Sequence, residues 1–314
     1  MKGYQLEVHG KAVSAARTVF LRLFSDIRAH AQGVLQGSQD DDVHDYRVSI
    51  RRTRSAMKLF KPILNHEQRQ YFKEGFRSVA RSTNHLRDLE VFLENRPVYL
   101  KALSREDREN IEPLFYYLEQ EQVEEFKQLI IMLQQPGYHS FLEEWDAFLR
   151  SDDETIARDG QAVQVRLIPF ADESVRTLFD RVQTLRSEVE QSEDYELMHQ
   201  LRIECKQLRY ALEFFHDLNP DRFPVVIKML KKVQDHLGDL NDLVNHERIT
   251  QDVIREWRGM DAKTDESCSA CSALLAYLKT RQKELTDQFP DVFHAFTEKM
   301  NSVAEDDLTA QSIN

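Results

Sequence analysis

The sequence predicts an all-α protein made of two related helical halves, and three observations lead to this fold class. Glycine and proline, which disfavour helix, are scarce at 9 and 8 of 314 residues. Apolar residues recur three and four positions apart along most of the chain, which is the spacing of one helix face. A pair of helix motifs also occurs twice in the same order, as expected for an internal duplication.

The apolar spacing, together with glycine and proline, sets the expected helices. Residues 10–36 show the pattern clearly, with Val13, Phe20 and Ile27 on one side. Pro97 is expected beyond the end of a helix, and Pro136-Gly137 ends another. The expected helices span residues 10–36, 43–64, 67–95, 104–134, 138–150, 170–191, 194–217, 221–257, 268–289 and 291–303.

The segment 151–169 is acidic and then mixed, and it contains Gly160 and Pro169, so it reads as a linker between the halves. We therefore expect a first helical half at 1–150, this linker, a second helical half at 170–305 and a flexible tail at 306–314.

The composition excludes several classes of protein. No apolar run approaches the roughly 20 residues of a membrane helix, and the N-terminus lacks the apolar segment of a signal peptide. We therefore expect a cytoplasmic protein without a membrane partner. Cys268 and Cys271 form a lone CxxC with no second ligand pair, so no zinc site, other metal or cofactor is expected. The net charge of −12 argues against a polyanionic partner until the distribution of charge is considered.

The positive charge is concentrated in the repeated motif. Residues 43–54 recur as residues 198–209, and one helix later residues 85–89 recur as residues 236–240. At about 100° per residue, each copy places a histidine and several cations in one stripe beside an apolar face. The first stripe holds His44, Arg47, Arg51, Arg54 and Lys58, with Arg52 at its rim, and the second holds His199, Arg202, Lys206, Arg209 and Tyr210. The following helices add Arg77 and Arg81 in the first half and Lys228 and Lys232 in the second.

Like charges stacked at helical spacing destabilise an empty helix, so an anionic partner is the natural explanation for these stripes. Arginine forks bind phosphate oxygens in pairs, while lysine supplies a mobile point charge. A linear polyanion would meet many such donors in succession, with strong salt dependence. If the leading histidines His44 and His199 titrate at the ligand, binding should tighten as the pH falls from about 7.5 to 6.

The motifs resemble those of the CHAD family, the conserved-histidine α-helical domain. His-x-x-Arg-x-x-x-Arg-Arg-x-Arg begins at His44, and His-x-x-Arg-x-x-x-Lys-x-x-Arg-Tyr begins at His199. Leu-Arg-Asp-Leu at residues 86–89 and Leu-Gly-Asp-Leu-Asn-Asp at residues 237–242 follow in the family's order. The resemblance covers residues from about 8 to about 300. It implies two pseudo-symmetric bundles of the four-helix type around a central basic groove that binds inorganic polyphosphate.

The resemblance also assigns the ligands position by position. It implies that the histidines His44 and His199 contact polyphosphate, with support from Lys231 and Lys232. The basic ligands that it implies are Arg47, Arg51, Arg52, Arg54, Arg202, Lys206 and Arg209. Gln207 stands where the first copy has Arg52, and His85 and His236 lie outside the family signature. The family also implies an association with polyphosphate granules and their proteins. No segment resembles the CYTH triphosphatase domain that often accompanies it, so a stand-alone binding protein is expected rather than an enzyme.

Two alternatives stay open at this stage. A metal-dependent phosphohydrolase acting on polyphosphate or triphosphate would need clustered carboxylates, for which Asp88, Asp239 and Asp242 are the candidates. Salt bridges to arginine are the simpler role for Asp88 and Asp239. A nucleic-acid-binding module is disfavoured by the acidic net charge and by the lack of an aromatic platform among the arginines.

Overall fold

The computed structural model describes residues 3–37, 40–192, 195–260 and 262–304, and it confirms the all-α fold class. Within these residues the β-structure consists of two isolated bridges, Lys11 with Arg166 and Leu64 with Ala157. The predicted tail at 306–314 lies outside the described residues. No described helix is both long enough and apolar enough to cross a membrane.

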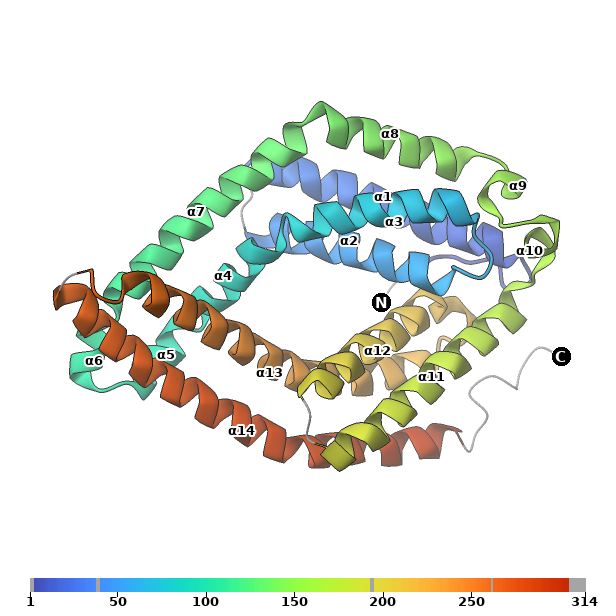
Figure 1. Ribbon diagram of the computed structural model, residues 1–314. Helices are drawn as coiled ribbons and strands as arrows, with labels where there is room; N and C mark the ends of the chain where they lie inside the picture. The colour runs from blue at the N-terminus through green and yellow to red at the C-terminus, as the bar shows by residue number, and fades with distance from the viewer. Residues whose placement is uncertain (1–2, 38–39, 193–194, 261, 305–314) are drawn as a thin grey trace. The chain divides into compact units, whose positions relative to one another are not determined.

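The helices follow one another along the chain with short connections (Figure 1). In the first part of the chain they are α1 Ala12–Leu35, α2 Asp40–Leu59, α3 His66–Arg81, α4 Asn84–Glu94, α5 Arg96–Ala102, α6 Arg105–Asn110, α7 Glu112–Gln134 and α8 Pro136–Arg150. The rest are α9 Asp153–Ile156, α10 Gly160–Gln164, α11 Leu167–Ser192, α12 Tyr195–Phe214, the 3₁₀ helix η1 His216–Leu218, α13 Phe223–Trp257 and α14 Ala262–Ala304.

Several expected helix boundaries were wrong, and a proline explains one of them. Pro97 lies beyond the end of α4, as expected, and it also lies in the first turn of α5, where its missing N–H costs nothing. Pro290 lies inside α14, so the two helices expected at 268–289 and 291–303 are one. The helix expected at 67–95 is divided into α3 and α4 at Ser82 and Thr83. That expected at 104–134 is divided into α6 and α7 at Ile111.

The chain forms two compact units, and each contains segments from both predicted halves. Unit 1 comprises Met1–Ser82, Ile130–Gln234 and Phe293–Asn314, and unit 2 comprises Thr83–Leu129 and Asp235–Val292. The division into halves at 1–150 and 170–305 therefore describes a sequence repeat and stays a prediction. The intervening segment 151–169 carries α9 and α10, and its Ile156 and Ala157 are buried.

Unit 1 is organised around α1, α2, α11 and α12, with α1 packed on α2 and α11 packed on α12 (Figure 1). Its core is aromatic. The ring of Phe60 stacks on Phe170 at 5.6 Å and meets Phe20 and Phe215 edge-on at 6.1 and 6.0 Å. Phe60 and Phe215 hold the same position in the two sequence copies, so this contact is of the kind that a local two-fold axis predicts.

Unit 2 has its own core, built from α4, α5, α7, α13 and α14. At its centre His246 is 1% exposed, and its ring packs at a tilt against Phe92, with ring centroids 4.7 Å apart. The hydroxyl of Tyr99 lies 2.5 Å from Nδ1 of this imidazole. Burial lowers the pKa of His246 to about 4, because the apolar surroundings disfavour the charged ring.

Replacing His246 with Gln should therefore make the free energy of unfolding depend less on pH in the mildly acidic range. In the unfolded chain the imidazole has its ordinary pKa of about 6.5. The contribution of neutral His246 is complete above that pH and is lost as the pH falls towards 4. Between pH 6.5 and 4.5 the wild type should lose about 2 kcal/mol more of its free energy of unfolding than His246→Gln, measured by urea denaturation. The exposed His139→Gln should follow the wild-type curve, and parallel curves for His246→Gln would contradict the assignment.

Candidate functional site

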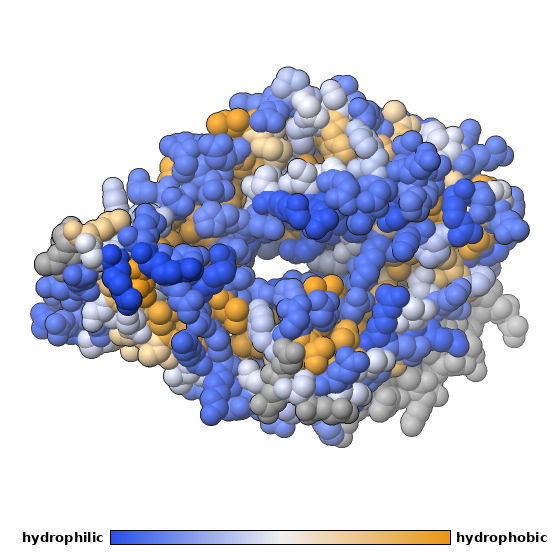
Figure 2. Space-filling view, viewed as in Figure 1, coloured by the Kyte–Doolittle hydropathy of each residue, from blue (hydrophilic) through white to orange (hydrophobic). Residues whose placement is uncertain are grey.

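All the predicted polyphosphate-binding residues belong to unit 1, on α2, α3, α12 and the first part of α13. His44, Arg54, Arg77 and Arg81 are exposed, as are the lysines of α13. Arg47, Arg51, His199, Arg202 and Lys206 are half-buried, which is expected for cations on the shoulder of a core-facing helix. The viewed face of the molecule is mostly hydrophilic (Figure 2).

The two repeated helices, α2 and α12, contact each other directly. Nε of Arg51 donates to the hydroxyl of Tyr210 at 2.8 Å. The side-chain amide of Gln207, which is buried, donates to the carbonyl oxygen of Ser55 at 2.9 Å. Positions 51 and 55 thus meet 210 and 207 in opposite order, as expected for helices that cross with opposing chain directions. Arg51 and Tyr210 belong to the two predicted stripes, so the stripes meet at this crossing.

A single buried carboxylate lies at this crossing. Glu213 is 2% exposed, and its two oxygens accept hydrogen bonds from Nη2 of Arg52 at 2.6 Å and Nη1 of Arg209 at 3.2 Å. The ring of Tyr210 lies 5.9 Å from the guanidinium carbon of Arg52 and 4.7 Å from that of Arg209. Both cations therefore have a carboxylate and an aromatic ring as neighbours, which offsets the cost of partial burial.

Sequence reasoning missed Glu213. A weak signal was available, because Glu213 lies four positions after Arg209 and stands alone in the apolar run Leu212-Glu213-Phe214. A lone acid among core residues indicates a buried ion pair. The second partner, Arg52, could not be inferred from the sequence, because it comes from a helix far away in the chain.

Three arginines gather on the neighbouring surface formed by α2 and α3. The pKa of Arg54 is lowered, first by burial and then by the charges of Arg77 and Arg81. Glu74 opposes this shift and lies 3.5 Å from Nη1 of Arg77, but both side chains are nearly half exposed, so this ion pair contributes little. We call Arg54, Arg77 and Arg81 the arginine cluster. Its members repel one another in the absence of a ligand.

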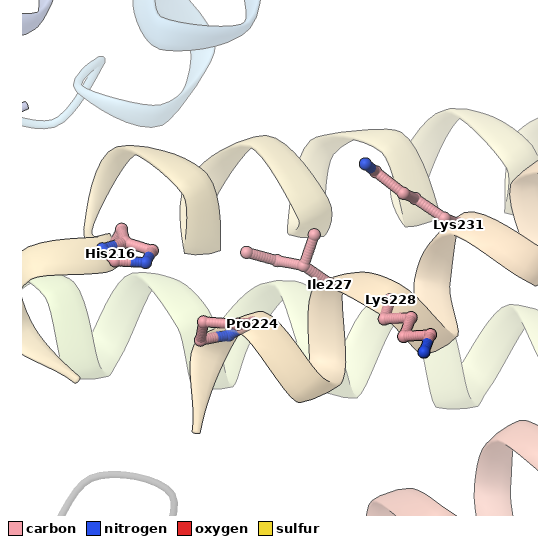
Figure 3. A pocket seen from close by; sticks show the side chains of 5 residues that line it. All are labelled: His216, Pro224, Ile227, Lys228 and Lys231. Carbon is pink, nitrogen blue, oxygen red and sulfur yellow. The ribbon is translucent and has the colours of Figure 1, made fainter. Parts of the chain in front are cut away.

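The lysines of α13 border a separate pocket of about 200 Å³ (Figure 3). Lys228 and Lys231 leave α13 in different directions, and Pro224 and Ile227 supply an apolar surface between them and His216. The described residues that line this pocket include none of the arginines. A hydrogen bond joins α13 to α12, because the side-chain amide of Gln234 donates to the carbonyl oxygen of Cys205 at 2.8 Å.

The remaining sequence candidates belong to unit 2. Nε2 of His236 donates to the carbonyl oxygen of Leu285 at 2.7 Å, and Nε2 of His85 lies 3.6 Å from a carboxylate oxygen of Glu121. Both histidines therefore have protein partners. Asp239 and Asp242 line a pocket of about 240 Å³, and the pKa of Asp239 is raised by burial and by the charge of Asp242.

Within the part of the chain that is described, no group of three or more His, Cys, Asp or Glu side chains has the arrangement needed to hold a metal ion. The thiol pKa values of Cys205 and Cys271 are raised by burial, which keeps both thiols protonated and inert.

Comparison with known proteins identifies the fold. The family model of the CHAD domain matches residues 18–249, a range that includes both copies of the histidine-led motif. A crystal structure of the CHAD domain from the plant Ricinus communis superposes with a TM-score of 0.76 at 22% identity, covering 92% of this chain and 94% of that one. PptA from Streptomyces chartreusis gives 0.71 at 14% identity, covering 91% and 100%. At these identities the likeness shows the fold alone. No curated protein sequence matches the chain.

Removing one charge from the arginine cluster should stabilise the unligated protein. We expect Arg77→Gln to raise the free energy of unfolding by about 0.3 kcal/mol at low ionic strength, because repulsion with Arg54 is relieved. The gain should disappear in about 1 M salt, where the Debye screening length is about 3 Å. Denaturation curves at both salt concentrations measure this. Arg105→Gln, at a highly exposed position on α6, is the control and should show no such gain. Destabilisation of Arg77→Gln at low salt would show that the cluster is not repulsive.

Proposed function

This chain belongs to the CHAD family, and we propose that it binds inorganic polyphosphate without hydrolysing it. The observation that carries the proposal is the arginine cluster. The pKa of Arg54 is lowered by burial and further by the charges of Arg77 and Arg81, within a chain whose net charge is −12. A self-repelling group of cations is unfavourable when it is empty and favourable when a polyanion lies on it. The family resemblance supports polyphosphate as that polyanion.

The distribution of the cations supports a linear ligand over a compact one. From His44 to Lys58 the stripe on α2 rises about 1.5 Å per residue, which gives a length of roughly 20 Å. The arginine cluster extends it onto α3, and the contact of α2 with α12 continues it to Arg209. Arginine forks spaced along such a path bind successive phosphates, each with charge-assisted hydrogen bonds.

The carboxylates near the cations support binding without catalysis. Hydrolysis assisted by a metal ion needs carboxylates that are available to hold the metal. In unit 1, Glu213 accepts from two arginines, and Glu204 accepts from Nζ of Lys58 at 2.8 Å. These acids already neutralise protein cations. Incubation with polyphosphate and magnesium or manganese should therefore release no phosphate, and release above a no-protein control would overturn this part of the proposal.

Binding to granules would follow from the same chemistry. A polyphosphate granule presents many chains at once, so a protein with this affinity would collect there together with other granule proteins. Colocalisation of a fluorescent fusion with stained granules tests this, and a diffuse signal in cells with abundant granules would exclude it.

Neutralising two members of the arginine cluster should weaken binding and reduce its salt dependence. We expect Arg54→Gln/Arg81→Gln to bind long-chain polyphosphate at least tenfold more weakly at about 0.1 M salt, because two charge-assisted phosphate contacts are lost. The slope of log K against log salt concentration should become shallower by about 1 to 2. Isothermal titration across a salt series measures both quantities.

The matched control is Arg105→Gln/Arg255→Gln, which removes the same charge from two exposed positions in unit 2. It should retain nearly the full affinity and slope. Equal losses in the two double variants would mean that only net charge matters. Single-stranded RNA of similar charge is the competitor, and RNA that displaces polyphosphate at equal charge concentration would favour a nucleic-acid-binding function instead.

A further inference from the structure

Glu213 holds one arginine from each copy of the repeat. Arg52 is on α2 and Arg209 is on α12, and both donate to the same carboxylate. The carboxylate is 2% exposed, while the two arginine side chains are 24% and 16% exposed. The acid is therefore covered by the protein, whereas both arginine side chains are partly exposed to solvent. An incoming anion meets the arginines and not the glutamate.

The two guanidiniums keep donors for a ligand. A guanidinium has five N–H groups, and Glu213 takes one nitrogen from each arginine. Nε of Arg52 and Nε of Arg209 are both buried without a hydrogen-bond acceptor in the protein. Unsatisfied buried donors are costly, and an acceptor brought by a ligand would relieve that cost after a small movement of the side chains.

We propose that Glu213 is a positioning residue, which fixes Arg52 and Arg209 as a pair that binds neighbouring phosphates of one polyphosphate chain. The inference rests on the proposed function. It adds a reason why a polyphosphate chain would bind more tightly than single phosphate ions. Without the shared carboxylate, the two half-buried cations would repel each other and separate. With it, their spacing is set before the ligand arrives, so less conformational freedom is lost on binding.

A positioning role and a pure charge effect predict opposite changes in polyphosphate affinity for the same substitution. Glu213→Gln is nearly isosteric and removes one negative charge from the site. If only the field of the site mattered, the variant would bind a polyanion more tightly. If Glu213 acts by positioning, the variant binds more weakly, because the amide carries only one acceptor oxygen and its NH₂ group faces a cation.

Glu204 provides a matched control. It lies on the same helix, is 15% exposed and pairs with Lys58, which is 45% exposed. Among the described residues, no second cation forms an ion pair with Glu204. Glu204→Gln makes the same change of charge without releasing an arginine pair. We expect long-chain polyphosphate to bind Glu213→Gln about tenfold more weakly than the wild type, and Glu204→Gln as tightly as the wild type or up to about twofold more tightly.

The experiment is titration of the full chain with long-chain polyphosphate, tripolyphosphate and orthophosphate, with circular dichroism to confirm folding. The affinity ratio of chain to orthophosphate should fall about tenfold in Glu213→Gln and stay unchanged in Glu204→Gln. A folded Glu213→Gln that binds the chain as tightly as Glu204→Gln overturns the positioning role. A wild type that binds no polyphosphate overturns the proposed function instead.

Arg52→Lys covers the case in which Glu213→Gln does not fold. It keeps the charge and the carboxylate but replaces the planar fork with a single ammonium. Positioning predicts a loss of about tenfold in chain affinity with little change for orthophosphate. Arg105→Lys on α6 is its control and should bind as the wild type does. An unchanged affinity of Arg52→Lys would also overturn the proposal, since charge alone would then suffice.

Discussion

The contact between α2 and α12 is the constraint on which the site depends. Both helices carry cations along one side, so bringing them together would be unfavourable if charge alone decided their packing. The crossing is stabilised by hydrogen bonds of other kinds. The amide of Gln207 donates to a backbone carbonyl, and the hydroxyl of Tyr210 accepts from Arg51. The buried carboxylate of Glu213 accepts from Arg52. Below them, Phe60 and Phe215 close the aromatic core of unit 1. Core packing and a few polar contacts thus hold the cations closer together than their mutual repulsion alone would allow.

The same arrangement explains how an acidic chain can present a basic surface. The net charge of −12 is a sum over the whole chain, whereas the arginine cluster is confined to α2 and α3. Coulomb interactions between exposed groups are screened within about 10 Å at moderate salt, so a ligand on the cluster responds to its near neighbours. The local density of positive charge, and not the net charge of the chain, therefore decides which ions approach the cluster. The cost is that the pKa of Arg54 is lowered, first by burial and then by the charges of Arg77 and Arg81.

Much of this could be read from the sequence, because the helical periodicity and the repeated cation spacing are local features. The all-α class and the positions of α1, α8 and α13 follow from them, whereas the meeting of the two halves at one groove was implied only by the family resemblance. The breaks were not predictable, since the apolar pattern continues through Ser82-Thr83 and through Pro290, and tertiary packing decides whether a helix ends there. Glu213 was missed for a related reason. A glutamate four residues after an arginine is common on exposed helix faces, and only the crossing of α12 with α2 buries this one.

The departure from symmetry at the crossing has a physical reason. In the register of the repeat, Arg52 corresponds to Gln207 and Lys58 corresponds to Glu213. Two identical copies with arginine and lysine at these positions would place cations against cations where α2 meets α12. The second copy instead has a neutral amide at one position and a carboxylate at the other. The amide binds backbone, and the carboxylate binds Arg52 and Arg209. If the halves arose by duplication, the crossing is where their sequences had to diverge, because a contact between like-charged equivalents cannot be buried. The first copy then keeps more arginines, and the second supplies the amide and the carboxylate that hold the crossing together.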